Sequence, residues 1–212
     1  RYRKETLELE VIRTLEPDRL TERYIYRNTG YYDLYFQRGG LGIYATFNDS
    51  YPESDICIKK RCHAHIWCGG EHSYIHARKM GPFPTELALI LTHGSLDSYS
   101  VERIEQEMSN DRGDFVLHPS PCHLLPGSEM VLEWQLVAFP QGKFQETLLA
   151  VNNGIWVEFA RETIFPEEKF EISVESRHWE GKISVSCRGE SVPYKMRDGR
   201  LLVEYTPQAL GE

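Results

Sequence analysis

Histidine and cysteine, whose side chains can bind metal ions, are concentrated in one segment, residues 57–76. The spacing in this segment is C-x4-C-H-x-H-x2-C-x3-H-x3-H, which matches no zinc-finger pattern. Successive side chains of a β-strand point to opposite faces, so in RCHAHIWC the pair His63 and His65 faces one way and the cysteines face the other. We therefore expect the two histidines to act together and the cysteines to line the core.

The His63–His65 pair on a strand, followed by Glu71, resembles the metal-binding motif of the cupins. The resemblance implies a site of two histidines and one carboxylate, with His72 or His76 as a further donor. Such a ligand set suits iron or manganese. Glu71 stands farther from His65 than is usual in that family. The alternative is a protein without metal or other cofactor, in which the histidine face is exposed or half-buried.

The same face offers a different chemistry, because Trp67 shares it with the two histidines. Tyr74 is expected on the neighbouring strand, across the Gly69–Gly70 turn. An aromatic ring can stack on the C–H face of a sugar while flanking polar groups bond its hydroxyls. Trp67, His63, His65 and Tyr74 therefore form a candidate carbohydrate-binding surface. Aromatic residues on strands also stabilise sheets by cross-strand pairing, so a structural role is the alternative.

Paired carboxylates carry out acid–base catalysis in glycosidases, which draws attention to Asp49, Asp111 and Asp114. All three lie in turn-forming sequences, where aspartate commonly stabilises the turn. The sequence has no G-x-S-x-G, P-loop or G-x-G-x-x-G motif, the usual markers of nucleophile-elbow hydrolases and nucleotide enzymes. No catalytic residue is therefore assigned.

Short segments that alternate between polar and apolar residues dominate residues 1–165, and turn sequences separate them about every 8–12 residues. Leu7, Leu9 and Val11, for example, alternate with glutamates. This pattern predicts an all-β fold, with an antiparallel β-sandwich or jelly-roll-like large domain. Two segments are compatible with a helix: residues 100–108, where a strand is the alternative, and residues 143–150, where apolar residues recur at helical spacing.

The sequence changes character near residues 164–168, Ile-Phe-Pro-Glu-Glu. Beyond this point, compact alternating segments follow, with a hairpin turn at Asp198-Gly199. We therefore divide the chain into a β-sandwich domain, residues 1–165, and a smaller β domain, residues 166–212. The second resembles the first half of an immunoglobulin-like domain. The resemblance implies a partial, truncated domain, because so short a segment supplies too few strands for a closed sandwich.

The composition excludes two classes of partner. The 212 residues include 24 basic and 32 acidic ones, for a net charge of −8, and no long basic segment. Binding to nucleic-acid phosphates requires clustered Lys and Arg, so no nucleic-acid partner is expected. No apolar segment approaches about 18–20 residues, so no membrane partner is expected. The odd number of cysteines, 5, predicts reduced thiols and a cytoplasmic location.

Three segments are similar to carbohydrate-active enzymes, namely residues 87–103, residues 109–142 and the strands after Pro166. In the second, LLPGSEMVLEWQLV resembles the closing strands of β-sandwich domains that precede (α/α)-barrel domains in bacterial glycoside hydrolases and phosphorylases. The resemblance implies a non-catalytic module of a multidomain enzyme, inactive alone, whose partners are carbohydrate and the rest of the parent polypeptide. The chain does not begin with Met, which agrees with a piece of a longer protein. A cupin-like metal enzyme and a purely structural or interaction module are the alternatives.

Overall fold

The computed structural model describes residues 1–48, 62–81, 83–102, 114–152, 154–161, 163–177, 179 and 181–208. These residues form two compact units, Arg1–Thr147 and Leu148–Glu212. Antiparallel strands make up nearly all the regular structure, and α2 (Phe144–Val151) is the one α-helix within the described ranges. The predicted all-β, sandwich-type fold is therefore confirmed. No helix in the described part of the chain is long and apolar enough to cross a membrane.

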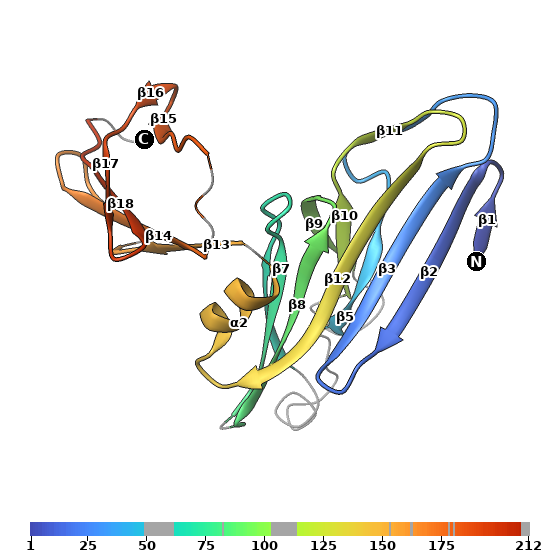
Figure 1. The fold of residues 1–212 in the computed structure, drawn as a ribbon, viewed down its shortest axis with the longest axis horizontal. Helices are drawn as coiled ribbons and strands as arrows, with labels where there is room; N and C mark the ends of the chain where they lie inside the picture. Colours follow the sequence, from blue (N-terminus) through green and yellow to red (C-terminus); the bar gives the residue numbers. More distant parts are fainter. Residues whose placement is uncertain are drawn as a thin grey trace. The chain divides into compact units, whose positions relative to one another are not determined.

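The large sheet of the first unit has seven strands in the order β1-β2-β3-β12-β8-β7-β6 (Figure 1). On the face of this sheet opposite the core, ion pairs connect neighbouring strands, for example Arg27 with Glu10 at 2.7 Å. These charged side chains alternate with the apolar ones that the sequence pattern placed inside. The strands are β1 (Tyr2–Lys4), β2 (Leu7–Leu15), β3 (Arg19–Asn28), β12 (Glu129–Pro140), β8 (Thr85–His93), β7 (Tyr74–Lys79) and β6 (Cys62–Trp67).

Two smaller sheets complete the first unit. One has the order β5-β10-β9, and the other pairs β11 with β4. The core between the layers draws Tyr24, Leu89 and Trp134 from the large sheet and Ile43 and Leu117 from the three-stranded sheet. Two layers therefore enclose one apolar interior, as in other β-sandwiches. The strands are β5 (Ile43–Asn48), β10 (Asp114–Pro119), β9 (Leu96–Glu102), β11 (Cys122–Leu124) and β4 (Leu34–Phe36).

Trp134 takes part in a hydrogen-bond network within this core. Its ring centroid lies 4.8 Å from that of Tyr24, and its indole Nε1 donates a hydrogen bond to Glu22 Oε2 at 2.9 Å. The Tyr24 hydroxyl donates to the same oxygen at 3.3 Å, and Arg13 pairs with Glu22 at 2.5 Å. Buried tryptophan needs an acceptor for its N–H group, and Glu22 supplies it while Arg13 balances the charge.

The division between the units falls within α2, whereas the sequence predicts a boundary at residue 165. The reason is that β13 (Ile155–Phe159) pairs along its whole length with β14 (Phe170–Ser176). Both strands therefore belong to the sheet of the second unit. The residues at 164–168, where the sequence changes character, form the connection between two paired strands and not a linker between domains.

The second unit has a four-stranded sheet in the order β13-β14-β18-β17, and a separate pair of short strands. Its small core contains Val192, Leu201 and Val203. The hairpin turn between β17 and β18 is confirmed, because Asp198 and Gly199 have φ values of 52° and 78°. The likeness to an immunoglobulin-like domain stays a prediction. The remaining strands are β18 (Arg200–Tyr205), β17 (Tyr194–Arg197), β15 (Ser186–Cys187) and β16 (Glu190–Ser191).

The described cysteines Cys68, Cys122 and Cys187 are free and half-buried, Cys62 is also half-buried, and Cys57 lies outside the described residues. Burial raises the pKa of the Cys68 thiol to about 11 and also raises the pKa of Cys122. Because the thiolate is the reactive form, iodoacetamide at pH 8 should alkylate Cys68 at least about tenfold more slowly in the folded protein than in urea, and Cys122 should also react more slowly when folded. Timed labelling with peptide mass spectrometry measures these rates, and equal rates would contradict the packing.

Candidate functional site

The hairpin of β6 and β7 positions the predicted site residues. Along β6, His63, His65 and Trp67 are exposed, while the residues between them pack against the core. The predicted sharing of one face by these three side chains is therefore confirmed. β7 pairs antiparallel with β6 and places Tyr74 opposite Trp67, as expected for strands joined across the Gly69–Gly70 turn.

The same register brings two further side chains onto this face, because His76 lies opposite His65 and Arg78 opposite His63. Both contact Glu86 on β8. Arg78 Nε donates to Glu86 Oε1 at 3.0 Å, and His76 Nε2 lies 2.7 Å from Glu86 Oε2. The Glu86 side chain is only 5% exposed, so its charge depends on these two partners.

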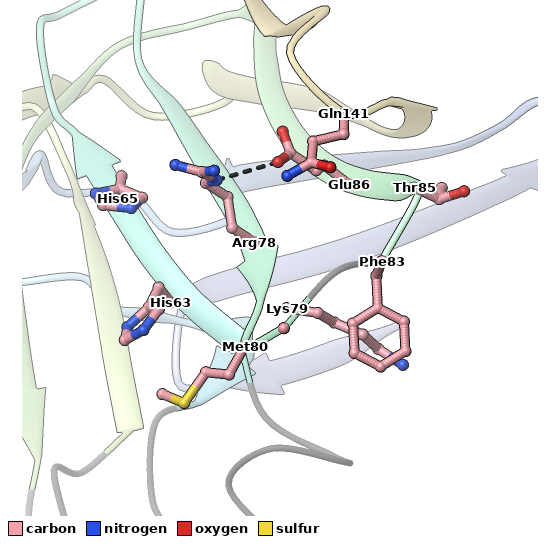
Figure 2. Close-up of a pocket in the computed structure, with 10 residues that line it drawn as sticks. His63, His65, Arg78, Lys79, Met80, Phe83, Thr85, Glu86 and Gln141 are labelled. Atoms are coloured by element: carbon pink, nitrogen blue, oxygen red, sulfur yellow. Dashed lines mark hydrogen bonds and ion pairs between the residues drawn. The ribbon is translucent and has the colours of Figure 1, made fainter.

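A groove of about 420 Å³ opens beside this network. In Figure 2, His63 and His65 lie on one side of Arg78, and Glu86 and Gln141 lie on the other. The volume is within the range of about 300–1,000 Å³ found for small-ligand sites. The polar side chains that line the groove are His63, His65, Arg78, Lys79, Thr85, Glu86 and Gln141.

Burial and hydrogen bonding shift the pKa values of His76 and Glu86 in opposite directions. His76 stacks on the ring of Phe144 at a centroid distance of 4.1 Å, and burial lowers the pKa of His76 although its bond to Glu86 acts in the other direction. Burial alone would raise the pKa of Glu86, but the hydrogen bonds from His76 and Arg78 outweigh it, and the pKa is lowered. Near neutral pH, a neutral His76 therefore donates to an ionised Glu86, and Arg78 carries the balancing charge.

We expect the first unit to lose stability as the pH falls below about 6.5, the ordinary pKa of histidine. A side chain whose pKa is lower in the folded than in the unfolded state contributes stability above its unfolded pKa. This contribution is lost as the pH falls through the folded pKa. The pKa values of His76 and Glu86 are both lowered in the folded protein. As the pH falls, the histidine is protonated before the glutamate.

The His76→Gln variant isolates this effect, because glutamine cannot titrate but still offers Glu86 a donor. Urea unfolding at pH 7 and pH 5 should show a larger loss of unfolding free energy for the wild type than for His76→Gln. Equal losses would show that His76 does not carry the pH dependence.

The structure brings His63 and His65 into the groove, but not Trp67 or Tyr74. Trp67 lies over Gly69, where an added Cβ would collide with the indole ring. Tyr74 is half-buried, and its ring packs edge-on against Phe144 at 5.0 Å. Trp67 thus stays available on the same face beyond the groove, whereas Tyr74 contributes mainly to packing.

The cupin-like set of ligands is not assembled. Within the residues that the structure describes, no three His, Cys, Asp or Glu side chains gather closely enough to hold a metal ion. Glu71 lies in the turn between β6 and β7, and it does not line the groove. Of the three aspartates considered for catalysis, Asp114 begins β10, and Asp49 and Asp111 lie outside the described residues.

Sequence reasoning missed Arg78, Lys79, Glu86 and Gln141. The alternation in HSYIHARK was a signal for Arg78, because it places this residue on the same face of β7 as Tyr74 and His76. Glu86, an acidic residue at the start of an apolar strand, was a weaker signal.

A solved structure shows what this architecture is similar to. The chain matches a protein described as a polysaccharide lyase with a TM-score of 0.86 and 28% sequence identity, over 98% of this chain and 31% of that one. The chain is similar to part of a polysaccharide lyase. It spans about a third of the length of that protein. No protein-family model matches the sequence, and no significant match exists among curated proteins.

The similarity supports the expected carbohydrate-active, β-sandwich-type protein. It extends over both units, since nearly the whole chain is covered. The expected glycoside hydrolase or phosphorylase parent, with its (α/α)-barrel, stays a prediction.

Proposed function

We propose that the chain is a non-catalytic β-sandwich module of a polysaccharide-cleaving enzyme, and that the groove beside β6, β7 and β8 binds the polysaccharide. The observation that carries this proposal is the polar, basic groove on a chain that is similar over 98% of its length to a polysaccharide lyase. The same similarity favours a lyase over a hydrolase or phosphorylase as the parent enzyme. The isolated chain should be inactive.

The charge of the groove suits an acidic saccharide. Arg78 and the buried Glu86 balance each other, so Lys79 supplies the excess positive charge. Lys79 Nζ lies 4.4 Å from the ring centroid of Phe83, a cation–π contact at the rim of the groove. His63 and His65 add ring N–H donors. Carboxylate groups bind well to such an arrangement. The chain as a whole is acidic, with a net charge of −8, so the attraction is local.

The two other functions have less support. A cupin-like enzyme requires a metal-binding group that the described residues do not form. A purely structural module requires no groove, and it would leave the exposed His63 and His65 without a role. Carbohydrate binding accounts for both observations.

Calorimetric titration with soluble polygalacturonate, an acidic polysaccharide, tests the proposal. We expect the double variant His63→Ala/His65→Ala to bind about tenfold more weakly than the wild type, because two hydrogen-bond donors are removed. Both histidines are exposed, so the fold should be unaffected. Raising the salt concentration should also weaken binding, because an exposed basic groove is screened.

The control is His93→Ala, which removes an exposed histidine of β8 that does not line the groove. It should bind like the wild type. The proposal fails if the wild type does not bind, or if the groove variant and His93→Ala bind equally well.

A further inference from the structure

We infer a second saccharide-binding surface, separate from the groove and formed by residues 31–35 together with β11. Three tyrosines lie exposed within five residues: Tyr31 is 94% exposed, Tyr32 84% and Tyr35 68%. Single exposed aromatic side chains are common, but a cluster of them usually marks a contact site. None of the three belongs to the core between the layers, so their rings do not stabilise the interior. The inference rests on the proposed function only for the ligand class, a polysaccharide.

Neighbouring side chains fix the position of the Tyr35 ring. It pairs with His123 across β4 and β11, and the two rings stack with a centroid distance of 4.3 Å and an interplanar angle of 10°. The Tyr35 hydroxyl donates to Asp33 Oδ2 at 3.3 Å, and His123 Nε2 lies 2.8 Å from the same oxygen. One face of the Tyr35 ring therefore rests on His123, and the exposure of the side chain leaves the other face open.

The loop that presents Tyr31 and Tyr32 is anchored by the buried Asn28. Asn28 Nδ2 donates to the carbonyl oxygens of Tyr32 at 2.8 Å and Leu124 at 2.9 Å. Asn28 Oδ1 accepts a hydrogen bond from the Gly30 amide at 2.9 Å. The loop is thus attached to β11 by hydrogen bonds within the protein. Such preorganisation reduces the entropy that binding must cost.

The chemistry of this surface fits a neutral pyranose. The C–H face of a sugar stacks on an aromatic plate, and its hydroxyls can donate to Asp33 and exchange hydrogen bonds with His123. The Asp33 carboxylate disfavours an acidic sugar, whereas the charge of the groove favours one. The groove lies near the C-terminal end of β12 and the tyrosine surface near its N-terminal end, and the 12 residues of β12 span roughly 36 Å at about 3.3 Å per residue. Each site can therefore be tested without disturbing the other.

Native electrophoresis in gels that contain galactan, arabinan, xylan or mannan tests the surface. The protein carries a net charge of −8, so it migrates towards the anode and is retarded by a polysaccharide that it binds. We expect at least one of these neutral polysaccharides to retard the wild type. Tyr35→Ala and the double variant Tyr31→Ala/Tyr32→Ala should each weaken that binding about tenfold. Tyr35→Phe keeps the ring and should retain most of it.

Tyr2→Ala is the matched control, because Tyr2 is 68% exposed, like Tyr35, but lies on β1. Tyr31 and Tyr32 are exposed and do not belong to the core, so their double variant tests the surface even if Tyr35→Ala unfolds β4. The inference is overturned if no neutral polysaccharide retards the wild type. It is also overturned if the tyrosine variants behave like Tyr2→Ala.

The groove variant His63→Ala/His65→Ala separates the two proposals in the same gels. It should lose retardation by polygalacturonate but keep retardation by the neutral polysaccharide. Loss of neutral binding in this variant would overturn the second surface. Unchanged polygalacturonate binding would instead contradict only the proposal that the groove binds polysaccharide.

Discussion

The Trp134→Ala variant should lose about 4 kcal/mol of unfolding free energy, the usual cost of removing a buried tryptophan. Trp134 is buried in the core of the first unit and donates to Glu22, which would be left without one of its donors. Small domains are stable by only about 5–15 kcal/mol, so this loss should remove a large fraction of the stability of the unit. Urea unfolding followed by circular dichroism measures it.

The control is Trp67→Ala, which removes a tryptophan of the same size from an exposed position. It should change the unfolding free energy by less than about 1 kcal/mol. If Trp67→Ala and Trp134→Ala were equally stable, the core between the two layers would not be arranged as described.

The second large effect is expected for Glu86→Ala, with a loss of about 3 kcal/mol of unfolding free energy and weaker polysaccharide binding. Without the carboxylate, His76 and Arg78 lose the group that both contact, and a cavity is left in its place. Arg78 would also be free to move within the groove. The same urea experiment and the polygalacturonate titration measure the two consequences.

Glu129→Ala serves as the comparison, because Glu129 forms a half-exposed ion pair with Arg27 at 3.0 Å. Such surface pairs contribute roughly 0–1 kcal/mol, so this variant should be nearly as stable as the wild type. Glu86→Gln keeps the shape of the side chain and should fall between the two. A Glu86→Ala protein with normal stability would show that the buried network is unimportant.

Local sequence patterns predicted those features that depend on neighbouring residues. Alternation along β6 placed His63 and His65 on one exposed face, and the glycine turn placed Tyr74 opposite Trp67. The same pairing, continued for four residues, would have placed Arg78 opposite His63. The helix at residues 143–150 was predicted from its spacing, and the structure has α2 at Phe144–Val151.

Features that depend on distant residues could not be predicted in this way. Tyr74 was expected on the binding surface, but its burial depends on Phe144, which lies on another element. Glu86 forms its hydrogen bond with His76 only because β7 and β8 are neighbours in the sheet. The stacking of Tyr35 on His123 joins residues far apart in the sequence. The predicted domain boundary at residue 165 differs from the division in the structure, because the Pro-containing segment near residue 166 connects two paired strands of the second unit.

The most direct test of the central claim is a nuclear magnetic resonance titration of the 24.7 kDa chain with a short polygalacturonate oligosaccharide. We predict that the backbone amide signals of His63, His65, Arg78 and Lys79 shift in proportion to occupancy, with smaller changes elsewhere in the first unit. Saturating shifts at these four residues would place the saccharide in the groove. Absence of any shift, or shifts confined to other surfaces, would contradict the claim that this groove binds polysaccharide.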